Sequence, residues 1–386
     1  MNCKTIVGIA ACVFVPALAS AQTGIALGPD LSLHLTGDAQ VRWDDNVRLA
    51  AEGDSSDLAW VFTPGLELSY LGGLSKGTLT VTEEITSYDD LAHRIYEDEL
   101  FSAVGRYSYE GALTKVTAQA GYRELNQGSM TMRNREQAVR HTVSNASVDG
   151  LWSATAKTRI GAGFGYNAID YPESALADSV NVTVPLDFYY AATPKVDVSV
   201  GYRYRATYIW ERGTAQSADS KDHFFNVGAK GEFTPKLNGQ FRVGYGMRNP
   251  EVGETTGQLG FSGALTYVYS PKASFDLTVS NDFNNSGLGT SQKVLSFGAS
   301  GRFAFTPQWS AGMGLSYEMS DYAAVPGVTP SVRREDEFFV GNASVVYALD
   351  EVISFYAMYA HRENSSNRSG LGFNSNILSF GASLRY

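Results

Sequence analysis

Cysteine is nearly absent from this sequence. The only two cysteines, Cys3 and Cys12, lie within the first 21 residues of the 386-residue chain. The remaining residues therefore hold no disulfide and no thiolate metal site. Long apolar runs are missing as well, because no later segment offers the ~20 consecutive apolar residues that a transmembrane helix needs. These two absences exclude a disulfide-stapled secreted scaffold and a helical membrane protein.

The first residues have the pattern of an export signal. A short charged head ending at Lys4 precedes an apolar run from Ile6 to Leu18, and the small residues Ala19-Ser20-Ala21 follow. We therefore expect residues 1–21 to be removed and residues 22–386 to form one domain. No cysteine follows the small-residue exit, which argues against a lipoprotein.

Marks of catalysis, cofactors and nucleic-acid binding are also scarce. None of the five histidines has a metal-ligand spacing, and Gly161, Gly163 and Gly165 are spaced by two, so they share a strand face instead of opening a phosphate-binding helix. Such glycines thin a wall, bend a strand or let a neighbouring aromatic ring lie across them. We expect no cofactor, no metal and no nucleic-acid partner, and we predict that the protein is not an enzyme.

Aromatic residues and alternating patterns are abundant. In the segment KVDVSVGYRYRATYIW (195–210), valines followed by aromatics occupy one face of a strand, while Asp197, Ser199, Arg203, Arg205 and Thr207 occupy the other. The same alternation recurs in 240–248, 256–269, 273–280, 309–318 and 352–360. One such strand also fits a soluble sandwich, so the number of strands decides the architecture.

Short turn signals recur about every forty residues, with a pair of alternating segments between them. They lie at 71–77, 110–115, 151–157, 192–195, 234–237, 270–273, 306–309 and 348–351. Eight turns pair sixteen strands, and one strand at each end makes about eighteen, with sixteen as the alternative. Even strand number, aromatic strand ends, short turns and long loops predict an all-β transmembrane antiparallel up-and-down β-barrel of the bacterial outer membrane.

The last ten residues, ILSFGASLRY, alternate in the same way and nearly repeat VLSFGASGRF at 294–303. Because lipid leaves no partner for an open edge, we expect this strand to close the barrel beside LSLHLTGDAQVRW (31–43). A terminal aromatic residue resembles the signal that such barrels present to their assembly machinery. We therefore predict Phe380, Leu384 and Tyr386 as the assembly signal, and the internal copy as another lipid-facing strand.

Charges are separated by sign along the chain. Acidic residues predominate in the long polar segments, whereas six of the eight short turns hold a lysine, namely Lys76, Lys115, Lys157, Lys195, Lys236 and Lys272. The candidate pore-lining residues on polar strand faces are Arg106, Arg123, Arg159, Arg203, Arg205, Arg242, Arg302, Lys230, Glu232 and Asp276. Other acids expected there are Glu67, Glu83, Asp187 and Glu318. These charges either pair across strands or make a basic pore that favours anionic solutes.

Two motifs carry a resemblance to a known family. The segment VRWDDNVRL (41–49), with Asp44-Asp45-Asn46, and the segment SDLAWVFTPGLELSY (56–70), with Thr63-Pro64-Gly65-Leu66, resemble the start of bacterial outer-membrane barrels grouped as putative β-barrel porins. The last hairpin, 356–386, is similar as well. Several barrels of this kind accompany exopolysaccharide-synthesis operons, so the resemblance implies a place in the outer membrane of a Gram-negative bacterium and a broad role in transport.

Two classes of function follow from this reading. The first is a channel for a polar, and in one version anionic, solute or for exopolysaccharide. Its partners would be outer-membrane lipids, the barrel assembly machinery and the solute itself. The alternative is an outer-membrane enzyme of the lipase kind, for which His141 with Ser144 or His361 with Ser365 would have to pair, or a structural adhesin.

Overall fold

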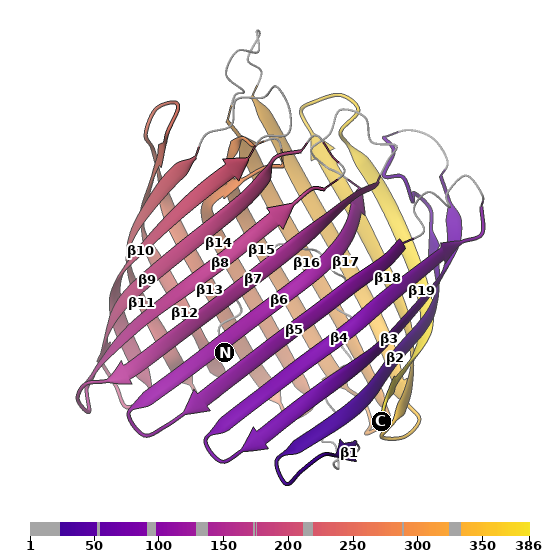
Figure 1. Ribbon diagram of the computed structural model, residues 1–386, viewed down its shortest axis with the longest axis horizontal. Coiled ribbons are helices and arrows are strands. Elements are labelled where there is room, and N and C mark those ends of the chain that lie inside the picture. The colour runs from indigo at the N-terminus through magenta and orange to yellow at the C-terminus, as the bar shows by residue number, and fades with distance from the viewer. Residues whose placement is uncertain are drawn as a thin grey trace.

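The computed structural model describes residues 24–51, 55–90, 98–128, 138–172, 174, 176–210, 219–287, 289–323 and 333–386. They form one closed antiparallel barrel of eighteen strands, with one further short strand at the rim (Figure 1). The predicted β-barrel and its count of eighteen are confirmed. The expected signal segment, 1–21, lies outside the described residues. None of the described residues forms a helix long and apolar enough to cross a bilayer.

The strands follow one another around the ring in chain order. Their bounds are β1 (Ile25–Ala26), β2 (Leu31–Asp44), β3 (Asp57–Gly72), β4 (Ser75–Tyr88), β5 (Asp98–Glu110), β6 (Thr114–Gly128), β7 (Ala138–Ser153), β8 (Thr158–Asp170), β9 (Asp178–Ala191), β10 (Val196–Trp210), β11 (Ser220–Thr234), β12 (Leu237–Pro250), β13 (Thr256–Ser270), β14 (Ala273–Asn285), β15 (Ser291–Ala304), β16 (Trp309–Tyr322), β17 (Arg334–Ala348), β18 (Ile353–Ser366) and β19 (Phe373–Arg385).

The terminal strand closes the barrel as predicted. β19 pairs with β2 from Ile377 opposite Asp44 to Arg385 opposite Thr36. Beyond that ladder, the Tyr386 N–H donates to the Leu35 carbonyl at 2.9 Å and the Leu35 N–H donates to the Tyr386 carbonyl at 2.8 Å. Both edges that a linear sheet would leave open are therefore paired with each other.

All eight predicted short turns connect consecutive strands at one rim, which is the periplasmic rim in barrels of this class. In the β17–β18 turn, the backbone N–H groups of Ile353 and Val352 donate to the Asp350 carboxylate and hold its pKa below its ordinary value. The strands rise from this rim to the longer connections at the opposite rim (Figure 1).

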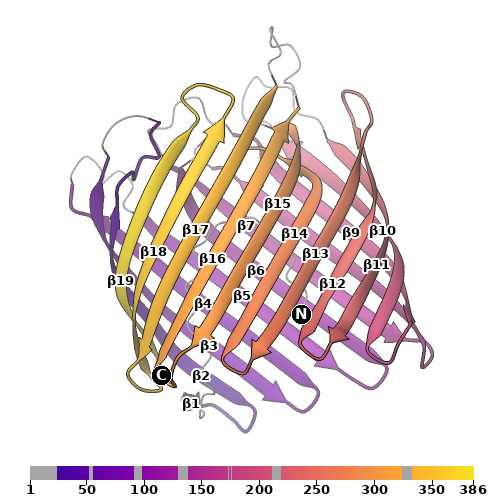
Figure 2. The same ribbon diagram turned by 180° about the vertical axis from the view of Figure 1, so that it is seen from behind.

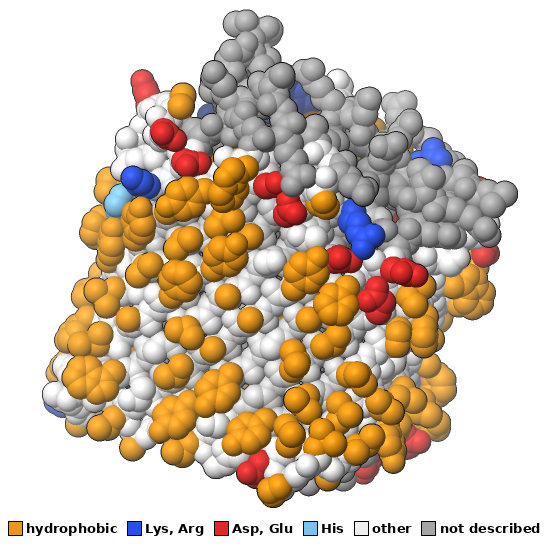
Figure 3. All heavy atoms as spheres, in the orientation of Figure 1, with side chains coloured by type: hydrophobic (Ala, Val, Ile, Leu, Met, Phe, Trp, Pro, Cys, Tyr) orange, Lys and Arg blue, Asp and Glu red, His pale blue; other side chains and the backbone are white. Residues whose placement is uncertain are grey.

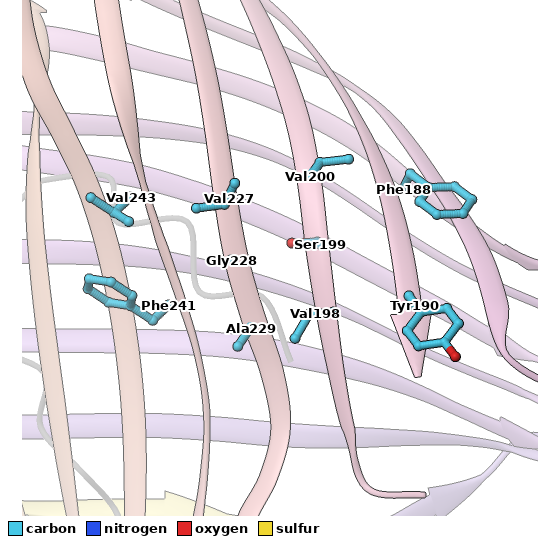
Figure 4. Close-up of a pocket in the computed structure, with 10 residues that line it drawn as sticks. All are labelled: Phe188, Tyr190, Val198, Ser199, Val200, Val227, Gly228, Ala229, Phe241 and Val243. Atoms are coloured by element: carbon cyan, nitrogen blue, oxygen red, sulfur yellow. The ribbon is translucent and has the colours of Figure 1, made fainter. Parts of the chain in front are cut away.

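The outer wall is apolar. On β10, Val198 and Val200 are 42% and 57% exposed while Ser199 between them is 8% exposed, and Figure 4 draws this alternation beside β9, β11 and β12. Phe188, Val227 and Phe241 continue the apolar surface on those neighbours. Hydrophobic side chains cover the face shown in Figure 3, and the charged side chains visible there gather toward the two rims. The phase of alternation predicted for this segment is confirmed.

Some inner glycines let a neighbouring ring lie flat against the wall. The Tyr189 ring lies 3.0 Å from the place where a Cβ of Gly161 would stand, and the Phe224 ring lies 2.5 Å from that of Gly260. The Tyr356 ring covers Gly381 in the same way, also at 2.5 Å. One of the roles predicted for period-two glycines is thus confirmed at Gly161.

Candidate channel lumen

The inner face carries the residues predicted to line a pore. Each falls on the strand face opposite the exposed apolar side chains: Arg106, Arg123, Arg159, Arg203, Arg205, Lys230, Glu232, Arg242, Asp276 and Arg302. Glu67, Asp187 and Glu318 lie on the same inner face. Glu83 does not, because it shares its face with Leu79 and Ile85, which are 44% and 40% exposed on the outer wall. The polar-face assignment of Glu83 was therefore wrong.

On the periplasmic half of β8 to β12, opposite charges pair across strands. The Arg242 Nη2 donates to Asp187 and to the Tyr189 hydroxyl, each at 2.9 Å. Arg159 pairs with Asp197 on β10, and the Lys230 ammonium lies 3.5 Å from the centre of the Tyr189 ring. This part of the wall is a network that is held together by charge and still faces the lumen.

The remaining predicted charges have simpler surroundings. Arg302 lies 3.5 Å from Asp276, its partner on β14. Arg106 and Arg123 on β5 and β6 make no ion pair with any described residue. Both face the lumen beside polar neighbours, since Gln119 is opposite Arg106 and Ser102 is opposite Arg123.

The six turn lysines lie at the rim of the short turns, where several contact a neighbouring strand end or turn. Lys115 pairs with Glu110, and Lys195 pairs with Glu232. Lys236 donates to the Tyr269 carbonyl at 2.8 Å, and Lys272 donates to the Phe305 carbonyl at 3.3 Å. Four of these six lysines therefore have a structural contact of their own.

A partly buried cluster of three arginines and two aspartates lies near the opposite rim. Arg248, only 1% exposed, donates from Nε and Nη2 to the two carboxylate oxygens of Asp222, both at 2.7 Å. Arg205 donates to Asp222 at 2.7 Å, and Arg203 donates to Asp282 at 2.7 Å. We call these five residues the latch cluster. The Arg205 side chain is 15% exposed, so it supports structure more than it contacts solvent.

The latch cluster holds the outer end of β14 away from its neighbour β13 in the wall. Arg205 on β10 donates to the Phe283 carbonyl on β14 at 2.7 Å, although β10 and β14 are four strands apart, or ~19 Å along the wall. An arginine side chain cannot span that distance, so the end of β14 must fold inward. Beyond it, the Ala177 N–H donates to the Gly287 carbonyl at 2.8 Å, which joins the β8–β9 connection to the hairpin tip. Figure 2 shows β13 to β15 in front and the curl at the upper end of this hairpin.

The β2–β3 connection also turns inward, and its Asp44-Asp45-Asn46 motif explains why. Asp44 accepts from Arg362 at 3.0 Å, and Asp45 accepts two hydrogen bonds from Asn376, both at 2.6 Å. The Asn46 side chain donates to the carbonyls of Ala50 and Asn374 at 2.9 and 2.7 Å. The motif therefore ties this loop to the last hairpin across the closing seam.

Past this motif the loop covers an apolar cluster on the inner wall. Leu49, the one described residue other than glycine with a left-handed backbone (φ 52°), packs against Phe338, Val340 and Phe373. A bulky residue takes this conformation rarely, so the packing and the Asn46 hydrogen bonds must hold it there. The outer end of the lumen is thus narrowed from two sides.

Sequence reasoning missed Arg248, Asp222 and Asp282 because they fall in polar segments, 248–257, 210–222 and 281–291, that the pattern predicts as long loops. The strands extend further than expected, and these residues continue the inner face of β12, β11 and β14. Continuing the period-two alternation past the last apolar residue of each strand would have placed them there.

The two Ser–His pairs considered for catalysis do not form. His141 and Ser144 lie on opposite faces of β7, because residues three apart on a strand alternate in direction. His361 and Ser365 share a face of β18 but are four residues apart, or ~13 Å. The described residues contain no group of three metal-ligating side chains.

The sequence matches the model of a known family. The family model described as putative beta-barrel porin 2 matches residues 37–386, which is nearly all of the barrel from β2 to the terminal tyrosine. The chain belongs to this family. Its members are porin-like barrels, and the protein is an outer-membrane protein of the Gram-negative type, as predicted. No curated protein sequence matches the chain significantly.

Several solved structures are similar to this porin-family barrel in fold. OpdL from Pseudomonas aeruginosa is 13% identical, with a TM-score of 0.45 over 92% of this chain and 99% of that one. A BenF-like porin from Pseudomonas fluorescens Pf-5 is 11% identical, with a TM-score of 0.46 over 94% and 100%. The FrpB iron transporter from Neisseria meningitidis is 8% identical, with a TM-score of 0.49 over 94% and 83%.

Proposed function

We propose that this barrel is a channel that passes small polar solutes across the outer membrane with a modest preference for anions. The observation that carries the proposal is the charge of the inner face of β8 to β12. Six cations, namely Arg159, Arg203, Arg205, Lys230, Arg242 and Arg248, meet three acids of these strands, Asp187, Asp197 and Asp222, and Asp282, which reaches them from β14. Glu232 of β11 is neutralised by the turn lysine Lys195 and is not counted. An excess of two positive charges remains on this strip.

A small excess of positive charge has a measurable effect on ion selectivity when it lies inside a pore. The low-dielectric wall of a pore focuses the field of its charges, so counter-ions of the opposite sign become concentrated in the lumen. The acids opposite the arginines keep the preference modest. The inward-folded hairpin and the β2–β3 loop narrow the outer end, which supports small solutes over a polysaccharide chain.

Ion selectivity in planar bilayers tests the proposal. Under a potassium chloride gradient, the reversal potential of the parent protein should show a weak anion preference. Replacing Lys230 and Arg242 with glutamine removes two lumen cations and should move the reversal potential toward cations. The shift should shrink at ~1 M salt, where the screening length is about 3 Å.

The control is Lys221→Gln, which removes one positive charge from the outer face of β11, where Phe225 and Val227 are also exposed. It should leave the reversal potential unchanged. Anion preference that survives both lumen substitutions would refute the role of the strip. A parent protein with no conductance would refute the channel itself and favour an adhesin.

A further inference from the structure

The outer end of β14 has left an empty place beside β13, whereas β15 stays paired with β16 as far as Gln292. The β13–β14 ladder stops at Phe261 opposite Asn281, although β13 continues to Thr256 and β14 continues to Asn285. Residues 256–260 of β13 keep β12 on one side. On the other side they pair with no strand among the described residues. The vacant edge of five residues is therefore long enough to pair with the four displaced residues of β14, 282–285.

Beyond Asn281, side-chain hydrogen bonds take the place of the backbone hydrogen bonds that β13 and β14 would otherwise make. If the register of the ladder continued, Phe283 would lie opposite Leu259. Instead, the Leu259 carbonyl accepts from the Asn281 side chain at 2.6 Å. The Phe283 N–H donates to the Asp282 carboxylate at 2.8 Å, and the Phe283 carbonyl accepts from Arg205 at 2.7 Å. The inward position thus leaves these groups satisfied without the ladder.

The sequence of β14 also fits the wall. Phe275 and Leu277 point outward and are each 48% exposed, and Phe283 has the same parity. In the wall, Phe283 would stand beside Leu259, which is 60% exposed on the outer surface, and Asp282 would face the lumen. In the inward position the Phe283 ring is 3% exposed and lies 5.0 Å from the Arg248 guanidinium. The alternating side chains at the outer end of β14 therefore suit both places, the barrel wall and the lumen.

We propose that the outer end of β14, together with the tip of the β14–β15 hairpin, is a two-position gate. In the closed position it is held inside the lumen by the latch cluster and by the contact between Ala177 and Gly287. In the open position Asp282 to Asn285 pair with the vacant edge of β13, and the ladder replaces the side-chain hydrogen bonds described above. The outer end of the lumen then widens. This gate requires a conducting barrel but is independent of the anion preference.

Two engineered disulfides report the two positions. In a background with Cys3→Ser and Cys12→Ser, the pair Ala177→Cys with Gly287→Cys should lock the hairpin inside. The pair Gln258→Cys with Asn284→Cys lies opposite in the extended register, where the Cα separation of ~4.5–5.5 Å suits a disulfide. Loss of free thiols on mild oxidation shows whether each disulfide has formed. Single-channel conductance before and after reduction with dithiothreitol then shows whether that disulfide narrows or widens the lumen.

Both disulfides should form. The inside disulfide should lower the conductance severalfold until it is reduced, and the wall disulfide should hold the conductance at its highest level. A wall pair that stays reduced while the inside pair oxidises would overturn the gate. The gate would also be overturned if the conductance were the same with the inside disulfide formed and with it reduced. If no variant conducts, the proposed channel fails, and the thiol measurement still decides whether the hairpin moves.

A charge variant tests the latch separately. Asp282→Asn removes the carboxylate that Arg203 and Arg205 share, so it should raise the fraction of time that the channel spends in its highest conductance level. The matched control is Asp276→Asn, which removes the same charge from the inner face of β14 where that strand remains paired with β13. Equal behaviour of the two variants would contradict the latch.

Discussion

Arginine at Leu315 should strongly destabilise the barrel, because this side chain points into lipid at mid-height. Leu315 is 56% exposed on the outer wall and lies six residues above Trp309 at the periplasmic end of β16. With ~3.4 Å per residue and a tilt of ~45°, the vertical distance is ~14 Å. Since the apolar band is ~25 Å tall, Leu315 lies near its centre, where arginine costs ~2–4 kcal/mol.

Two neighbours on the same strand provide the comparison. Met319→Arg, four residues closer to the upper interface, should cost only ~0–1 kcal/mol. Ser316→Arg should also have a small effect, because Ser316 faces the lumen beside Gly298 and near the inner Glu318. Equilibrium unfolding in urea with lipid vesicles, followed by the gel mobility of unboiled samples, measures all three. Equal losses at Leu315 and Ser316 would refute the assigned faces.

Three further predictions concern assembly and local packing. Deleting 377–386 removes the ladder between β19 and β2, so the truncated chain should not insert, and an unboiled sample should lose its shifted gel mobility. Asn46→Ala should lower the unfolding free energy by ~1–3 kcal/mol, since it removes the hydrogen bonds that the buried Asn46 side chain donates to the carbonyls of Ala50 and Asn374, and protease cleavage between β2 and β3 should increase. Gly244→Ala should cost ~1–3 kcal/mol or more in the same unfolding assay, because its Cβ would overlap the backbone of Phe225 and Asn226. Gly37→Ala, where no atom lies within 4 Å, should be nearly neutral; similar losses for both glycines would contradict this packing.

The architecture could be predicted because lipid imposes a simple rule on every strand. Alternation in segments such as 195–210 and the spacing of the short turns each follow from local chemistry. The closing partner of the terminal strand follows from the need to remove an edge. Both the strand count and the pairing of β19 with β2 can therefore be derived from the amino-acid sequence, and both are confirmed.

The latch cluster could not be predicted, because it depends on contacts between strands far apart in sequence. Arg205 meets the carbonyl of Phe283, 78 residues away, only because the hairpin leaves the wall. Alternation continues unchanged through Phe283, so nothing local indicates that the ladder ends at Asn281. The pairing of Arg242 with Asp187 and the loop contacts of Asn46 likewise arise from the curvature of the closed ring.

The rings that lie across inner glycines mean that the width of this lumen is not fixed by strand number alone. Tyr189, Phe224 and Tyr356 each lie over a glycine on another strand, so each adds roughly the thickness of a ring to the wall and not its full length. A methyl group at Gly161, Gly260 or Gly381 would tilt the ring toward the axis. Barrels with the same number of strands can thus differ in bore through single glycine positions, and a designer could adjust the bore here without altering the hydrogen-bonded wall.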